Sequence, residues 1–464
     1  MDKNKLILLL RTFSKEEFRQ MARFVRSPIY NRHELVIELF HYLRRQIEGK
    51  KKPIDKHKVL EHLFPDSPGD LQELHHLSSY LLRVAEQYLA WAEWQKDEKD
   101  WGTYLLRAYR KRGLDKPFRQ NLKKTRRQHD KQQLRNATFY RQQYQLQWEE
   151  HSYSASHGRS KGFHFQEFSD ALDQSFSAEK LKNACALLSH QAVSKEKYDM
   201  GILEAVLRHV KQKNWMTSPA IALHYHSCQA LLDADDDDSF QALKAQLINQ
   251  RQCFTLDELR DAHLLAINCC IRRINLRKPG YLREVFDLYR SGLELDLFLT
   301  DNQLSPFTYN NIILAGLKLN EFDWVLIFLQ NYQQYLPESQ RQSSYSYNLA
   351  RYYYELGDYQ QAMPLLMQME NDDLLHNLSA KSMLAKMYYE LQEYDALDSL
   401  LNSFRTYIYR KEVSYHRDFY LPFIGFMNRL VALRPYDRKG KEKLRQEVRA
   451  SRAPEKDWLL KQLG

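Results

Sequence analysis

The sequence predicts an all-α protein built mainly from paired helices. Its 464 residues include only 14 glycines and 13 prolines, too few for the frequent tight turns of β-sandwiches and barrels. Helix starts recur along the chain, and no stretch shows the alternation of apolar and polar residues that marks a half-buried strand. A chain of this length exceeds what one hydrophobic core usually serves, so we expect two domains or an elongated stack of repeats.

The four clearest helix starts carry recognisable caps. In a capping box, a Ser or Thr hydroxyl accepts the backbone N–H three residues on, and a Glu at that position returns the bond. In a second pattern, proline follows the capping serine at the first helical position. The capping boxes are Ser14 with Glu17 and Thr255 with Glu258, and the proline starts are Ser218-Pro219 and Ser305-Pro306.

Residues 1–105 are expected to form a separate N-terminal helical domain. This part of the chain lacks the repeat found further on, and its leucines recur at helical spacing. One predicted apolar face carries Leu35, Leu39 and Leu43, and a second carries Leu74, Leu77, Leu81 and Leu82.

Residues 106–164 carry most of the positive charge. The window from Arg107 to Arg141 holds thirteen Lys or Arg and two Asp, a net charge of +11 in a chain whose total is +10. We predict one long basic helix over 106–150, followed by a hinge or loop at 158–162. Because a phosphate responds to local potential, this stripe is a candidate nucleic-acid surface. Its candidate residues are Arg119, Lys123, Lys124, Arg126, Arg127, Lys131 and Arg135.

One observation counts against a nucleic-acid surface, and an alternative explanation of the charge exists. No base-reading module, such as a recognition helix or an aromatic-bearing sheet, accompanies the charge. The alternative is a solvated helix whose aromatic side packs on its neighbours and whose cations pair with acidic residues elsewhere.

An internal repeat is visible in the C-terminal half. The eleven residues 349–359 recur 35 positions later at 384–394, with seven positions identical. A looser copy lies 37 residues upstream, where Ile312, Leu319 and Phe322 fall opposite Leu349, Leu356 and Tyr359. This period indicates helix-turn-helix units of about 34 residues.

These residues resemble tetratricopeptide repeats. The matching positions are Leu349, Ala350, Leu356-Gly357-Asp358-Tyr359 and Ala362. The departures are Ser346 at the early tryptophan position, Gln392 in place of the turn glycine, and Val325 and Leu397 at a position that is small in the family. The whole chain, including residues 13–17 and 270–275, is also similar to tetratricopeptide-like proteins of Bacteroidetes bacteria, a resemblance that implies no activity.

The resemblance implies an α-solenoid. One helix pair cannot bury both of its apolar faces, so repeats stack on one another and form a curved array with a concave groove. We therefore expect a TPR-like solenoid over 165–433, clearest at 306–407, and a basic C-terminal helical cap or tail over 434–464. In this family, fixed positions of each first helix line the groove. Those positions correspond here to Tyr347, Arg351, Tyr354, Glu355, Lys386, Tyr389 and Glu390.

Tyrosine and arginine at such positions suit peptide recognition, because they combine a large contact area with directed hydrogen bonds. A receptor for chaperone tails is disfavoured, since Asn348 matches one clamp asparagine but three other clamp positions do not keep the family's residues. The other three are Leu314, Ser379 and Met383.

No catalytic signature is present. The chain contains no phosphate-binding glycine loop, dinucleotide fingerprint or nucleophile elbow. Glu38 with His41, and Glu73 with His76, have the spacing used by di-iron helix bundles, but a site of that kind also needs carboxylates from two further helices. We favour surface residues over a metalloenzyme.

Other metal-ligand patterns are equally incomplete. On a helix only His224 and Cys228 share a face, and two ligands do not close a zinc site. The acidic run 233–238 lacks the glycine and terminal glutamate of a calcium loop. We predict a solvated turn there, before a helix that starts at Ser239 or Phe240. We expect no metal and no cofactor.

The five cysteines are odd in number and form no Cys-x-x-Cys pair, which suits reduced thiols in a cytoplasmic protein. No export signal or membrane-spanning segment is visible. The sequence therefore favours a non-enzymatic cytoplasmic scaffold that binds a protein or peptide partner in the solenoid groove. A nucleic-acid-associated protein using the basic stretch 107–141 is the main alternative, and a helical-bundle metalloenzyme is a weaker one.

Overall fold

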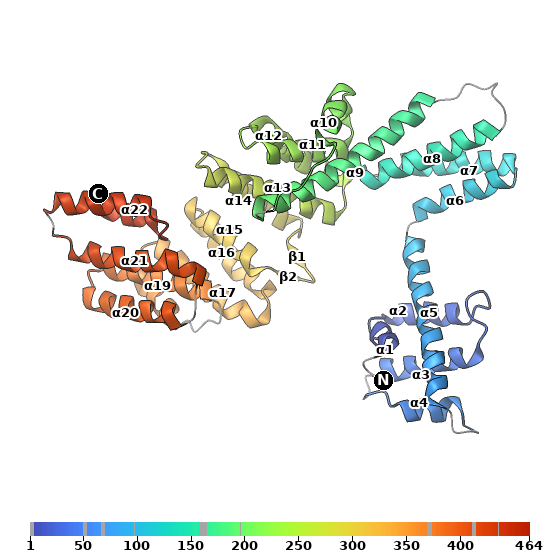
Figure 1. The fold of residues 1–464 in the computed structure, drawn as a ribbon, viewed down its shortest axis with the longest axis horizontal. Helices are drawn as coiled ribbons and strands as arrows, with labels where there is room; N and C mark the ends of the chain where they lie inside the picture. The colour runs from blue at the N-terminus through green and yellow to red at the C-terminus, as the bar shows by residue number, and fades with distance from the viewer. Residues whose placement is uncertain are drawn as a thin grey trace. The chain divides into compact units, whose positions relative to one another are not determined.

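The structure is a computed structural model that describes residues 4–49, 53–65, 70–96, 98–156, 165–194, 196–368, 374–410, 414–434 and 436–464 (Figure 1). These described residues form 23 α-helices, three short 3-10 helices and one two-stranded ribbon, which confirms the all-α class. The chain divides into two compact units. Unit 1 contains residues 1–132 and 138–175, and unit 2 contains residues 133–137 and 176–464.

Helices α1 to α5 open unit 1. Their bounds are α1 Lys5–Leu10, α2 Lys15–Val25, α3 Glu34–Glu48, α4 Lys56–Leu63 and α5 Leu71–Lys96. The long helix α5 contacts each of the other four (Figure 1). The predicted leucine faces of α3 and α5 are the core of this group, because Leu39, Leu43, Leu77 and Leu81 are all buried there. The capping box at Ser14 is confirmed, with both of its hydrogen bonds present.

Three helices occupy the region in which the sequence predicts one. The single basic helix predicted over 106–150 is wrong, because α6 (Glu98–Lys111), α7 (Asp115–Asp130) and α8 (Ala137–Ser156) replace it. Gly113, at φ +64°, ends α6. Its N–H bonds to the Arg110 carbonyl at 3.1 Å, and the Leu114 N–H bonds to the Tyr109 carbonyl at 3.1 Å, which reverses the chain. The predicted boundary at residue 105 lies inside α6, and the hinge predicted at 158–162 lies outside the described residues.

The second break has a tertiary cause. The Arg135 N–H donates to the Cys253 carbonyl at 2.8 Å, and the Ala220 N–H donates to the Arg135 carbonyl at 3.2 Å. The Asn136 side chain donates to Glu258 at 2.9 Å. These bonds hold residues 135 and 136 against unit 2, so the Arg135 backbone groups are unavailable for a helix.

The first part of unit 2 is a series of helices along the chain. They are α9 Phe165–Val193, whose first residues belong to unit 1, α10 Leu203–Gln212, α11 Pro219–Leu232, α12 Asp237–Asn249, α13 Leu256–Asn275 and α14 Tyr281–Glu294, with 3-10 turns η1 Trp215–Thr217 and η2 Arg251–Cys253. The capping box at Thr255 is confirmed. Helix α11 starts at Pro219 as predicted, although the Ser218 side chain makes no capping bond.

The second part continues the series. Its elements are α15 Pro306–Lys318, α16 Phe322–Tyr332, η3 Gln333–Tyr335, α17 Glu338–Glu355, α18 Tyr359–Met367, α19 Leu374–Glu390, α20 Tyr394–Arg410, α21 Ser414–Ala432, α22 Arg438–Ala450 and α23 Lys456–Gln462, preceded by the ribbon of β1 Leu299–Thr300 and β2 Gln303–Leu304. The two strands are antiparallel, with Leu299 opposite Leu304. None of the helices in the described ranges is long and apolar enough to cross a bilayer.

The helices of unit 2 pack in consecutive pairs. Helices α11 and α12, α13 and α14, α15 and α16, α17 and α18, and α19 and α20 contact each other, and the second helix of each pair contacts the first helix of the next. The core that joins α17 and α18 to α19 includes Ala350, Ala362, Leu384 and Met387. Helices α20 to α23 share a further core that contains Phe404, Phe423 and Leu459.

The turns within four of these pairs close in the same way. The residues with left-handed φ angles are Arg277, Asn320, Gly357 and Gln392, which follow the ends of α13, α15, α17 and α19, and their φ angles are 60°, 59°, 79° and 60°. In each turn this residue donates to the carbonyl three positions back, and the next residue donates to the carbonyl five positions back. That is the Schellman motif, which glycine favours because it has no Cβ. The repeat seen in the sequence is therefore also a repeat of backbone geometry.

The glycine at this turn gives a stability prediction. Replacing Gly357 by alanine should cost about 1 kcal/mol, because an L residue is strained at positive φ. A Cβ at Gly357 would meet nothing within 4 Å, so no clash adds to this cost. Chemical denaturation measures the change. The matched control is Gly425→Ala inside α21, which also meets nothing within 4 Å and should be neutral or stabilising. Equal losses in the two variants would contradict the assignment.

Candidate functional site

The seven predicted groove positions lie on two helices of unit 2. Tyr347, Arg351, Tyr354 and Glu355 lie on α17, and Lys386, Tyr389 and Glu390 lie on α19. We call these seven residues the groove positions. Two of them are bonded within α17, where the Arg351 guanidinium donates to the Tyr347 hydroxyl at 2.7 Å and lies 4.9 Å from its ring centroid. Among the groove positions on α17, Tyr347 is buried, Arg351 and Tyr354 are half-buried and Glu355 is exposed.

Lys386 is the most unusual of these residues, because its side chain is only 8% exposed. Its ammonium lies 4.6 Å from the centroid of the Tyr354 ring, a cation–π arrangement. The same ammonium donates to the Glu455 carboxylate at 2.6 Å. Burial, aided by the nearby Glu390 carboxylate, raises the pKa of Tyr354, so its phenol remains neutral beside the lysine. Together these contacts form a binding position for one carboxylate.

The neighbouring groove positions contact an aromatic ring. The Trp458 indole N–H donates to Glu390 at 2.5 Å, and its ring meets Tyr389 edge to face, with centroids 5.5 Å apart. Glu390 also accepts a hydrogen bond from the Tyr359 hydroxyl. A carboxylate with two donors and an adjacent tyrosine face can therefore hold an indole by both its polar edge and its ring.

Sequence reasoning missed Glu455 and Trp458, the two residues that occupy these positions. Glu455 is the N-cap residue of α23, and Trp458 lies in its first turn. The amphipathic pattern of residues 434–464 predicts a cap or tail, but nothing local in it indicates that the tail contacts α19. Lys386 and Glu455 are 69 residues apart, so the pairing is visible only in three dimensions.

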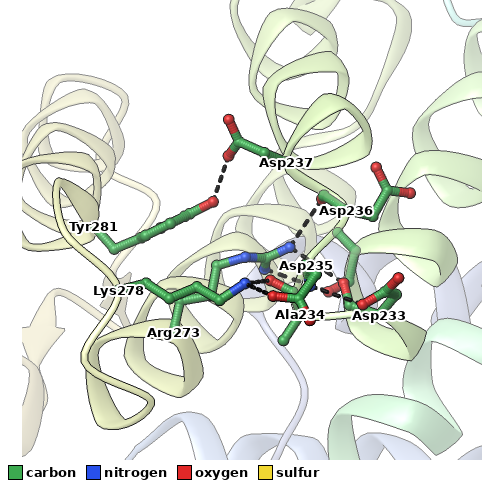
Figure 2. Close-up of polar contacts among 9 residues, drawn as sticks. Asp233, Ala234, Asp235, Asp236, Asp237, Arg273, Lys278 and Tyr281 are labelled. Carbon is green, nitrogen blue, oxygen red and sulfur yellow. Dashed lines mark hydrogen bonds and ion pairs between the residues drawn. The ribbon is translucent and has the colours of Figure 1, made fainter.

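A second polar cluster joins α11 and α12 to α13 and α14 (Figure 2). The sequence predicts a solvated turn at 233–238 and a helix start at Ser239 or Phe240. The predicted helix start is two residues late, because α12 starts at Asp237, where the Asp236 side chain caps it by accepting the Ser239 N–H at 2.9 Å. The predicted solvated turn is present, since Asp233, Asp235, Asp237 and Asp238 are exposed. The Lys278 ammonium donates to the Ala234 carbonyl at 2.6 Å and also bonds Asp235. This lowers the pKa of the Asp235 carboxyl.

Arg273 is at the centre of this cluster and is fully buried, with 0% exposure. Its guanidinium donates to the carbonyls of Ala230, Asp233 and Asp236 at 3.3, 3.4 and 3.0 Å (Figure 2). It also lies 5.2 Å from the ring centroids of both Phe240 and Tyr281. The Tyr281 hydroxyl bonds Asp237. The cluster binds one helix pair to the next, and solvent does not reach the arginine, so we assign it a structural role.

The predicted nucleic-acid residues are divided between the units. Helix α7 carries six of them, and all six are exposed: Arg119, Lys123, Lys124, Arg126, Arg127 and Lys131, the last at the C-cap. Arg135 is not among them, because it is half-buried in the 133–137 segment of unit 2. The predicted stripe is therefore shorter than the charge count suggests.

Acidic residues of α8 neutralise part of the positive charge. Glu149 is fully buried and accepts from Arg107 at 2.7 Å and from Arg110 at 2.8 Å. Glu150 pairs with Arg126. Within the described residues, Lys123, Lys124, Arg127 and Lys131 form no ion pair, so these four cations remain available to an anion.

The di-iron spacing leads to no assembled cluster. Glu38, Glu73 and His76 are exposed on α3 and α5, and His41 is half-buried. Across the described part of the chain, no group of three or more His, Cys, Asp or Glu side chains is placed to hold a metal ion. All five cysteines are buried free thiols, and Cys185 lies 3.5 Å from Cys228, sulfur to sulfur. Burial raises the pKa of Cys269 to about 11, which keeps this thiol protonated.

Unit 1 contains a small cavity between α6, α7 and α8. Its volume is about 200 Å³, and its lining residues are Gly102, Thr103, Thr125, Gln128, His129, Gln132, Gln142 and Leu146. The Gln132 amide donates to the Gln142 side chain at 3.4 Å, and the His129 ring stacks on Phe139 at 4.1 Å. The lining offers amide and hydroxyl groups but neither a carboxylate nor a lysine or arginine, and nothing in it indicates a catalytic arrangement.

Buried histidines give unit 2 an acid-sensitive stability. Burial, with a smaller effect of Lys182, lowers the pKa of His224 from 6.5 to about 4. The unfolded chain therefore binds this proton first, so the contribution of His224 to the stability of unit 2 should fall as the pH drops from 6.5 to 4 and level off below that. The loss should reach about 3 kcal/mol, at about 1.4 kcal/mol for each pKa unit.

Urea denaturation at a series of pH values tests this prediction. His224→Gln should flatten the pH dependence between 4 and 6.5, whereas the matched replacement of His57, an exposed histidine of α4, should leave it unchanged. An unaltered slope in the His224 variant would rule out this residue as the source.

Comparison of the chain with known protein families, with curated proteins and with solved structures found no significant match.

Proposed function

We propose that this chain is a non-enzymatic cytoplasmic scaffold that binds a protein partner. In this proposal, the helix pairs of unit 2 form a tetratricopeptide-like solenoid, and the groove positions on α17 and α19 line its binding groove. The consecutive pairing of helices and the four turns of the same kind support a repeat array.

One observation carries the binding function. The groove positions on α19 already hold a carboxylate and an indole in directed contacts, because Lys386 bonds Glu455 and Glu390 bonds Trp458. A surface that can hold these two groups from its own chain has the chemistry to hold them from another peptide. Buried aromatic and charged anchors dominate the energetics of protein interfaces, and Lys386, at 8% exposure, is a buried charge of this kind.

Affinity purification from the native cytosol, with and without nuclease, tests the proposal. A stoichiometric protein that survives nuclease should be absent when the double variant Arg351→Glu, Glu355→Lys is purified, because both residues lie on the accessible part of α17. The matched control is Arg405→Glu, an exposed residue of α20 outside the groove positions, which should retain the partner. Retention by the α17 variant as well would reject this groove as the binding site.

A second function is favoured by the exposed cations Lys123, Lys124 and Arg127 of α7 and Lys131 at its C-cap, none of which forms an ion pair in the described part of the chain. We infer that, if the chain binds nucleic acid, it does so through this helix. The triple variant Arg119→Glu, Lys123→Glu, Arg127→Glu should then abolish binding at physiological salt. Any binding that persists at low salt should have a log–log salt slope that is smaller by about 0.9 for each phosphate that the helix no longer neutralises.

The control for this variant has the same change in charge. Arg438→Glu, Lys439→Glu, Lys443→Glu alters three exposed cations of α22 and should bind as the unmodified chain does. Binding that survives in the α7 variant, measured by fluorescence polarisation on duplex and single-stranded DNA, would reject α7 as the site.

A further inference from the structure

We propose, resting on the protein-binding function above, that α23 is an intramolecular occupant of the groove positions and that the partner displaces it with the same chemistry. The partner would be a peptide segment with a carboxylate and an aromatic ring three residues apart, as Glu455 and Trp458 are. The C-terminal helix α23 would then show which side chains the ligand must carry, and it would also compete with the ligand for the groove positions.

The need for a carboxylate follows from the burial of Lys386. An ammonium that is 8% exposed is costly unless a negative charge and hydrogen bonds compensate it, and Glu455 supplies that charge at 2.6 Å. The ring of Tyr354 adds only a partial negative face. If α23 leaves, a ligand that lacks a carboxylate would leave Lys386 buried without a counter-charge. The groove therefore selects for acidic segments.

The need for an aromatic ring follows from Tyr389 and Glu390. The edge-to-face contact with Trp458 has an interplanar angle of 81°, and the indole N–H satisfies a Glu390 oxygen. An aliphatic side chain could fill the space but could not donate to Glu390. Tryptophan satisfies both requirements, and tyrosine offers a ring and a hydroxyl donor.

The attachment of α23 is of a kind that a ligand can compete with. This helix has only 7 residues, far fewer than an isolated helix needs to be stable. Leu459 and Leu463 are buried in the same core as Leu444 and Val448 of α22. Glu455 has a φ of 57°, which L residues rarely adopt, so part of the contact energy is spent on holding this conformation. The contacts of α23 with the groove positions described above are thus two polar contacts and one ring contact.

Two of the groove positions on α17, Arg351 and Glu355, remain accessible while α23 is in place. Arg351 is half-buried and Glu355 is exposed, and the contacts of α23 described above involve neither residue. A partner can therefore bind first to α17 and then exchange with α23 on α19. Such exchange would make the apparent affinity depend on the tethered helix, which competes at a high effective concentration.

Fluorescence polarisation with a labelled peptide of residues 452–464 tests the proposal on the full-length chain. The unmodified chain should bind the peptide weakly, because its groove is occupied. The double variant Glu455→Ala, Trp458→Ala should bind it about tenfold more tightly, since the tethered competitor can no longer bond Lys386 or Glu390. A further Lys386→Met change should abolish that gain, as should a peptide carrying Glu455→Gln and Trp458→Ala.

The matched control is Glu447→Ala, which breaks the ion pair of α22 with Arg429 and leaves the groove positions intact. It should bind the peptide as the unmodified chain does. Equal affinity of the unmodified chain and the double variant, or no binding to a double variant that folds by circular dichroism, would overturn the proposal. If the double variant does not fold, Glu455→Gln decides the question: tighter peptide binding than in the unmodified chain supports the proposal, and unchanged binding overturns it.

Light scattering distinguishes a second copy of this chain from a separate partner. A chain that is dimeric, and becomes monomeric in the double variant, would show that the occupant is α23 of another copy and would overturn the proposal of a separate partner. The α17 variant tests the underlying function independently. If a partner requires Arg351 and Glu355 but the double variant does not bind the peptide, the protein-binding function is retained. The proposal that α23 is the template for the ligand is then rejected.

Discussion

Replacement of Arg273 by leucine is expected to lower the free energy of unfolding of unit 2 by about 3–5 kcal/mol. The side chain is fully buried and supplies donors to three carbonyls at the end of α11 and in the loop that follows it. A leucine fills part of the volume but donates nothing, so those carbonyls would be left buried without partners. The change also removes the cation–π interactions with Phe240 and Tyr281.

The effect should extend beyond the loop. Because the loop that Arg273 holds also starts α12, its loss should loosen the packing of α11 and α12 on α13. Hydrogen exchange would register this as faster exchange in α12 than in α19. Urea denaturation gives the total loss of stability.

The adjacent arginine is a close control for this experiment. Arg272 lies on the same helix, is exposed, and donates to one carbonyl, that of Leu231, at 2.5 Å. Arg272→Leu should cost less than about 1 kcal/mol, because water can replace its bond. If Arg273→Leu cost no more than Arg272→Leu, the loop carbonyls would have found other donors, and the central role assigned to Arg273 would be wrong.

Arg273 also illustrates what the sequence could and could not predict. Local sequence signals predicted helix starts and buried faces correctly, because capping and apolar spacing act within a few residues. Both capping boxes and the leucine faces of α3 and α5 are present as expected. The burial of Arg273 was not predictable, since arginine is almost never fully buried and nothing in residues 270–275 indicates the rings that surround it.

Most of the failures share one physical cause, which is contact between residues far apart in the chain. Residues 133–136 leave the predicted basic helix because the Arg135 backbone bonds to Ala220 and Cys253. The solvated run 233–238 is also held by distant residues, because Arg273 and Lys278 bind its carbonyls. The candidate site shows the same division. The repeat period identifies the groove positions, but only the tertiary structure places Glu455 and Trp458 against them.

Replacement of Glu149 by leucine should destabilise the packing of α8 on α6 by about 2–3 kcal/mol. This carboxylate is fully buried and accepts hydrogen bonds from both Arg107 and Arg110. The expected loss of stability is smaller than for a completely buried ion pair, because the side chains of Arg107 and Arg110 are 44% and 22% exposed and can regain water. Removal of the acid would leave two arginines that repel each other.

The neighbouring residue provides the control, and a local probe provides the measurement. Glu150→Leu breaks an ion pair between partly exposed side chains, with Arg126, and should cost less than about 1 kcal/mol. Hydrogen exchange in α6 and α8 reports on this region, whereas exchange in α13 should remain unchanged in both variants. Equal effects of the two substitutions would mean that Glu149 contributes no more than a surface charge. In that case Glu149 would not be needed to hold α8 against α6 beside the basic helix α7.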